Sequence, residues 1–159
     1  MNTSSMKLVE RLGDQPDKAL VHGISRVSIQ ADAHGLPFGI TLWQHADIGT
    51  KIESVMHDLA ERIEVGVLSA TRVSVPSAHE VFIAAPSEFA GDLKLTKLVI
   101  EVELQRLESG LILTGRGGRE LVIVAGAYPY SLAILGLGEA PHRFEPEYPL
   151  ASYKRQKVL

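Results

Sequence analysis

Two stretches in the first third of the chain alternate between apolar and polar positions. In "ISRVSIQA" (residues 24–31), Val27, Ile29 and Ala31 point to one side of an extended chain, and polar residues point to the other. The alternation resumes over residues 38–43, after the break "DAHGLP". This pattern predicts two antiparallel strands that form a hairpin.

The stretch "TKIESVMHDLAERI" (residues 50–63) changes to a helical period. Thr50 and Glu53 have the spacing of a capping box, in which each side chain bonds the other residue's backbone N–H. Apolar residues then recur at steps of three and four: Ile52, Val55, Met56, Leu59 and Ile63. We therefore expect an amphipathic helix of roughly three turns. Residues 5–12 are compatible with a second, short helix.

The second half of the chain is rich in β-branched residues. The runs "EVGVL", "RVSVP", "EVFIAAP" and "YSLAILG" predict short strands, because Ser, Ala and Pro separate them. The run "LVIEVEL" (residues 98–104) alternates regularly, so Glu101 and Glu103 are expected to face water. Its predicted core residues are Leu98, Ile100, Val102 and Leu104.

A glycine cluster, Gly115, Gly117 and Gly118, lies between the apolar runs of residues 111–113 and 121–124. It has two interpretations, a phosphate-binding loop or the tip of a hairpin. A phosphate loop is normally followed by a helix, whereas the β-branched residues that follow here indicate a strand. The cluster therefore predicts a hairpin, and its two flanking runs predict central strands that are covered on both faces.

Together these elements predict an α+β fold. It consists of a mostly antiparallel sheet with one clear amphipathic helix and the short N-terminal helix. The chain of 159 residues is long enough for one domain with a sizeable core. We expect a single domain over residues 1–159, with an extended tail that contains proline, tyrosine and glutamate from about residue 139.

Composition narrows the functional classes. Hydrophobic residues make up 45% and charged residues 22% of the chain, as in ordinary globular domains. The formal net charge of -3 disfavours nucleic acid as a partner and permits a basic protein. The chain has no cysteine and no apolar run of the ~20 residues that span a bilayer. We expect a cytoplasmic protein that binds no membrane and no cofactor.

One group of residues suggests a small-molecule site. His45 and Asp47 are two residues apart at the end of a predicted strand, beside Trp43. His57 could join them only if the predicted helix folds back. The chain has none of the histidine spacings that define a metal site, so no metal is expected. The alternative function is therefore a small α+β enzyme or small-molecule-binding protein, with a site near Trp43, His45 and Asp47.

The tail combines aromatic rings, carboxylates and prolines. In "HRFEPEYPLASY", the candidate partner-binding residues are Phe144, Glu145, Glu147, Tyr148 and Tyr153. Tyr128 and Tyr130 precede them, so most of the tyrosines lie in one region. Proline-restrained segments of this kind suit a recognition surface, because part of the ordering cost is already met. The alternative is that the aromatic rings pack the tail onto the sheet.

The order "GLILTGRGGRELVIVAG…PYSLAI…FEPEYPL…Y" resembles the C-terminal part of small bacterial proteins of unassigned activity. Some of these are similar in style to the immunity proteins of toxin–immunity pairs. The resemblance covers roughly the last third of the chain and assigns no catalytic residue. It implies a compact, β-rich protein that binds another protein.

These observations favour a non-enzymatic protein-binding module, and an immunity-type inhibitor of a toxin is one form of it. The expected partner is a protein, and a basic one fits the charge. A third interpretation, a subunit of a homo-oligomer, follows if a flat edge strand is exposed.

Overall fold

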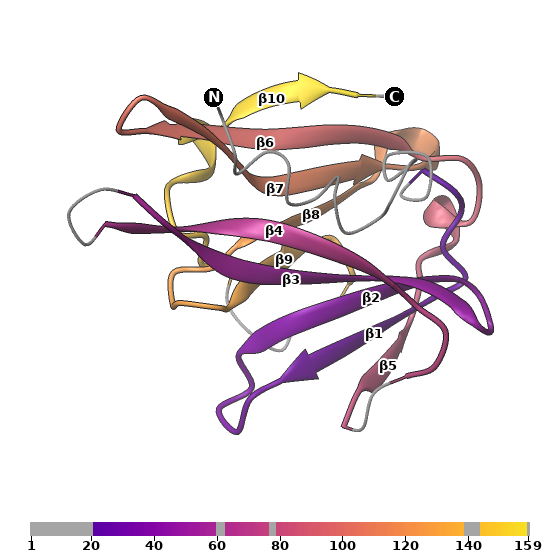
Figure 1. The fold of residues 1–159 in the computed structure, drawn as a ribbon. Helices are drawn as coiled ribbons and strands as arrows, with labels where there is room; N and C mark the ends of the chain where they lie inside the picture. Colours follow the sequence, from indigo (N-terminus) through magenta and orange to yellow (C-terminus); the bar gives the residue numbers. More distant parts are fainter. Residues whose placement is uncertain (1–20, 60–62, 77–78, 139–143, 159) are drawn as a thin grey trace.

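The computed structural model describes residues 21–59, 63–76, 79–138 and 144–158, and these form two five-stranded antiparallel sheets (Figure 1). The first sheet has the order β4-β3-β2-β1-β5 and the second has the order β10-β6-β7-β8-β9. The strands of the first sheet are β1 (Arg26–Ala31), β2 (Pro37–His45), β3 (Ile48–Asp58), β4 (Glu64–Val73) and β5 (Val81–Ala84). Those of the second are β6 (Lys94–Val102), β7 (Gln105–Thr114), β8 (Glu120–Ala125), β9 (Leu132–Leu135) and β10 (Lys154–Lys157).

The main hydrophobic core lies between the two sheets. Side chains alternate across a strand, so every second residue of the central strands points inward. The buried cluster includes Val27 and Ile29 from β1, Ile40 and Leu42 from β2, and Leu121 from β8. The hairpin predicted for the first two alternating stretches is confirmed, because β1 pairs antiparallel with β2.

The predicted helix over residues 50–63 is wrong, and with it the α+β class. Residues 48–58 form β3, which pairs with β2 on one side and β4 on the other. Glu53 forms no capping box, and its carboxylate lies 3.8 Å from the ammonium of Lys51. The apolar residues fit a helical spacing only locally. Residues 49–58 pair with β4 and residues 48–53 also pair with β2, and these long-range backbone hydrogen bonds decide the conformation of the segment.

The described residues contain no helix longer than a three-residue 3-10 turn. There are three such turns: η1 (Ser87–Phe89), η2 (Arg116–Gly118) and η3 (Leu150–Ser152). The helix expected over residues 5–12 lies outside the described residues. None of the described helices has the length and apolar character needed to span a membrane.

The glycine cluster forms a hairpin tip, as predicted. Strands β7 and β8 pair antiparallel up to Thr114 and Glu120, and η2 lies between them. Gly117 and Gly118 have φ angles of 71° and 79°, in the left-handed region that favours glycine. β7 and β8 are central strands of their sheet, which is also as predicted.

Two details of the second sheet differ from expectation. Leu104 does not face the core: Glu103 and Leu104 have φ angles of 51° and 64° and form the turn between β6 and β7, where Leu104 is fully exposed. The tail, expected as an extended segment, adds a strand to this sheet, because residues 154–157 form β10 beside β6 (Figure 1). The local alternation of apolar and polar residues indicates neither the position of a tight turn nor a pairing partner that is distant in the sequence.

Candidate functional site

The tail is fastened to the end of β8 by backbone hydrogen bonds. Gly126 and Pro146 form an isolated antiparallel bridge. On either side of it, the N–H of Ala127 donates to the carbonyl oxygen of Glu145 (2.9 Å), and the N–H of Glu147 donates to that of Ala125 (2.9 Å). The tail therefore runs in a fixed register beside the turn that follows β8.

The aromatic residues of the tail pack against the protein. Tyr153 is only 5% exposed, and Phe144 and Tyr148 pack against the same hydrophobic cluster. The rings of Tyr148 and Tyr153 meet edge to face with centroids 6.4 Å apart. The hydroxyl oxygen of Tyr153 accepts the N–H of Tyr148 (3.3 Å), and burial raises the pKa of that phenol. Of the five predicted partner-binding residues, only Glu145 is classed as exposed.

The carboxylate of Glu147 covers an edge of the first sheet. Its Oε1 accepts the backbone N–H of Gly66 in the edge strand β4 (2.9 Å). Burial raises the pKa of this carboxyl, and the hydrogen bond from Gly66 opposes that shift. Glu147 therefore satisfies a backbone donor that an edge strand would otherwise leave open.

Two tyrosines stand out from the turn between β8 and β9, residues 126–131, which we call the tyrosine turn. Tyr128 is 60% exposed and Tyr130 is 58% exposed. The carbonyl oxygen of Tyr128 accepts both the N–H (3.0 Å) and the hydroxyl (2.6 Å) of Ser131, and the N–H of Gly126 donates to the carbonyl of Ser131 (2.8 Å). Tyr130 has a φ of 64°, which is rare for a residue other than glycine. The turn is thus held in one conformation with both rings toward solvent.

A shallow cleft of about 530 Å³ separates the tyrosine turn from the loop between β1 and β2. Asp32, Leu36 and Tyr128 are among its lining residues. The Asp32 carboxylate accepts the N–H groups of His34 (2.8 Å) and Leu36 (3.0 Å). The hydrogen bond from Leu36 is the main cause of a lowered pKa at Asp32, so its negative charge is favoured in this loop.

These features share one end of the molecule. Glu145 is exposed, and its carbonyl bonds the residue before Tyr128. We call Asp32, Tyr128, Tyr130 and Glu145 the aromatic–acidic end. The sequence analysis predicted that the tyrosines lie in one region, and the largely exposed rings among them are those of the tyrosine turn.

The residues of the alternative site differ in exposure. Trp43 is fully buried, whereas His45 and Asp47 are exposed. His57 lies at the other end of β3, where its Nε2 is 3.2 Å from the side-chain oxygen of Gln105. In the part of the chain that the structure describes, no group of three or more His, Cys, Asp or Glu residues could hold a metal ion.

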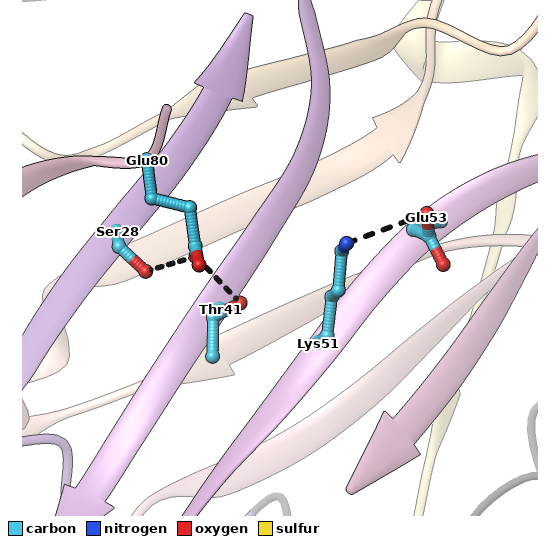
Figure 2. A network of polar contacts seen from close by, with 5 residues as sticks. All are labelled: Ser28, Thr41, Lys51, Glu53 and Glu80. Atoms are coloured by element: carbon cyan, nitrogen blue, oxygen red, sulfur yellow. Dashed lines mark hydrogen bonds and ion pairs between the residues drawn. The ribbon is translucent and has the colours of Figure 1, made fainter. Parts of the chain in front are cut away.

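The indole of Trp43 belongs to a polar network on the outer face of the first sheet. Its Nε1–H donates to Ser28 Oγ (2.9 Å), and the Ser28 hydroxyl donates to Glu80 Oε1 (2.6 Å). Figure 2 shows Glu80 between Ser28 and Thr41, whose hydroxyl also donates to Oε1 (3.3 Å). Because Ser28 and Thr41 are buried and satisfied, this network fastens the start of β5 to β1 and β2.

A buried ion pair also escaped the sequence analysis. The ammonium of Lys97 lies 2.6 Å from a carboxylate oxygen of Glu108 on the neighbouring strand, and both side chains are less than a tenth exposed. No local pattern marks such a pair, because its partners meet only through the register of β6 and β7. Its burial makes it a structural contact rather than a site open to a ligand.

We compared the chain with protein-family models, with curated proteins and with solved structures, and none of them matches it.

Proposed function

We propose that this protein is a non-enzymatic protein-binding module that contacts its partner through the aromatic–acidic end. The observation that supports it is the tyrosine turn, in which hydrogen bonds hold Tyr128 and Tyr130 with both rings exposed. Tyrosine is enriched among the residues that dominate binding energies, because it offers a large rigid surface with a polar tip.

The backbone of the tyrosine turn has a rare conformation at Tyr130. A non-glycine residue in the left-handed region costs free energy, and such residues persist where the surroundings enforce them, often at functional sites. Tyr130 is such a residue, and its conformation directs a ring outward instead of burying it. A turn fixed before binding loses little conformational entropy when the partner docks.

The charge around the two rings favours a basic partner. Asp32 and Glu145 lie beside the tyrosine turn, and the whole chain has a net charge of -3. Complementary charge increases the rate of association and excludes acidic competitors. An immunity-type inhibitor that covers a basic toxin is one protein with this mode of action.

The test begins with recovery of a partner from lysate of the native host, followed by binding kinetics. The double variant Tyr128→Ala/Tyr130→Asn removes both rings, and asparagine tolerates the left-handed backbone at position 130. We expect faster dissociation and a loss of about 2 kcal/mol or more, as for hot-spot residues. Glu145→Gln should mainly slow association and reduce its dependence on salt.

The matched control is Phe82→Ala, which removes an exposed ring from β5, an edge strand of the first sheet. It should leave the kinetics unchanged, and thermal melts should show that every variant is folded. Equal affinity of the double variant and the wild type, or an equal loss in Phe82→Ala, would contradict the proposal. Recovery of no partner at any salt concentration would also contradict it.

A further inference from the structure

A second concave site lies at the opposite end of β2 from Asp32. It is a cleft of about 450 Å³ whose lining includes His22, Gln44, His45, Ile48, Thr50 and Arg72. β2 has nine residues and so separates this cleft from the aromatic–acidic end by roughly 27 Å, at ~3.3 Å per residue.

The cleft begins where the hydrophobic core ends. Thr50 pairs with Leu42 on one side and with Arg72 on the other, so these three side chains lie in one row across β2, β3 and β4. Leu42 is buried in the core, whereas Arg72 is exposed. The opposite wall is fixed by close contact of Gly23 with Ala90, since a Cβ at Gly23 would overlap the carbonyl oxygen of Ala90.

The polar side chains that line the cleft are all hydrogen-bond donors, and one of them is a cation. None of the described residues that line it is acidic, although the chain has a net charge of -3. Its polar side chains are a guanidinium, two imidazoles, an amide and a hydroxyl, and all of them can donate hydrogen bonds. Within the described residues, the side chain of Arg72 has no hydrogen bond or ion pair, so its guanidinium is available to a ligand.

We propose that this cleft binds a small anion that carries carboxylate or phosphate groups. The Arg72 guanidinium presents paired N–H donors that match two oxygens of such a group. His22 and His45 line the same cleft and carry imidazole donors, and the buried Thr50 supplies a hydroxyl. The volume is in the range of small-molecule sites, and the guanidinium disfavours a cation as the ligand.

The experiment titrates the full chain with inorganic phosphate and with citrate and follows backbone amide shifts by NMR. We expect saturable shifts at residues of the cleft, such as Gly23, Thr50 and Arg72. Arg72→Gln should weaken binding at least roughly tenfold, the effect of losing one charge-assisted hydrogen bond. His22→Ala/His45→Ala removes both imidazole donors at two exposed positions, and should weaken binding without affecting the fold.

The matched control is Arg116→Gln, which removes an exposed arginine from the tip of the glycine hairpin. It should bind both anions as the wild type does. Vesicles of phosphatidylglycerol distinguish a lipid phosphate from a soluble one. If the protein sediments with the vesicles only when Arg72 is present, and binds neither soluble anion, the ligand is a lipid headgroup. The proposal is overturned if no probe gives saturable binding, or if Arg72→Gln and Arg116→Gln reduce binding equally.

Discussion

At the scale of single residues, Glu147 connects the pH of the solution to stability. Burial raises the pKa of its carboxyl above the usual value of 4.5. The folded chain therefore holds this proton more tightly than the unfolded chain does. The resulting stabilisation is fully present below the unfolded pKa and is lost as the pH rises through the folded pKa.

We expect Glu147→Gln to remove this dependence, because the amide oxygen can still accept the N–H of Gly66. The free energy of unfolding of the variant, relative to the wild type, should rise from about pH 4.5 to just above the folded pKa and then level off. Urea unfolding at a series of pH values measures it. A difference that stays constant over that range would show that Glu147 does not titrate as described.

Ser28 is a second residue with a measurable role, because it links Trp43 to Glu80. Ser28→Ala would leave the buried indole N–H without its acceptor, and should destabilise the fold by about 1–3 kcal/mol. Chemical denaturation of this variant can be compared with that of Ser74→Ala, which changes an exposed serine and should have an effect within about 0.5 kcal/mol. Equal stabilities of the two variants would contradict the role of the network.

The residue types along the sequence predicted only part of the candidate site. The clustering of tyrosines and carboxylates in the last third of the chain is visible in the sequence. Which rings face solvent depends on where the tail crosses the protein, and this buries Tyr153 while the tyrosine turn remains exposed. Arg72 and His22 line the same cleft as His45 because of strand pairing and because Gly23 contacts Ala90. No local sequence pattern indicates this pairing or this contact.

At the scale of elements, the pattern of apolar residues located most strands but misassigned β3. Ile52, Val55, Met56 and Leu59 satisfy a helical spacing by coincidence. In the strand, Ile52 faces the core and its neighbours Lys51 and Glu53 face outward. When the apolar residues of a short segment fit both a helix and a strand, the strands that pair with it decide which of the two forms. For β3 these strands are β2 and β4, which come next to it only in the folded chain.

Strand β4 packs closely on β8 at Gly66. A Cβ on Gly66 would lie 2.7 Å from the Cβ of Ala125, so the two strands approach closely because position 66 has no side chain. Gly66→Ala should therefore destabilise the fold by about 1–3 kcal/mol through overpacking. Gly91→Ala is the control, because an added Cβ there meets nothing within 4 Å. Thermal melts of both variants test this, and a Gly66→Ala variant as stable as the control would contradict it.

At the scale of the whole molecule, the two sheets have four edges that are protected to different degrees. Glu147 covers part of β4, exposed Lys and Arg side chains line β10, and β9 is only four residues long. β5 is as short and as apolar as β9, but three of the four residues of β9 are buried, whereas Val81 and Phe82 of β5 are exposed. Charged residues discourage edge-to-edge pairing, so β5 is the least protected of these edges.

We therefore expect concentration-dependent self-association through β5. Val81→Lys should shift it toward the monomer, because a charge at the edge opposes pairing, while the contact of Arg26 with Phe82 is retained. Sedimentation velocity over a range of concentrations measures this, with Lys154→Gln on β10 as the control. The expectation of an oligomer through this edge is lost if the wild type and Val81→Lys remain monomeric at every concentration.

The place of β10 in the second sheet has a consequence for synthesis on the ribosome. β6 pairs with residues 154–157, so one edge of β6 stays open until that segment has left the exit tunnel. The cluster that contains Tyr153 cannot close earlier either, because this ring is part of it. A nascent chain arrested before Lys154 should therefore remain sensitive to protease and bind holdase chaperones. A chain released after Lys157 should become resistant, and pulse proteolysis of stalled complexes can follow this change.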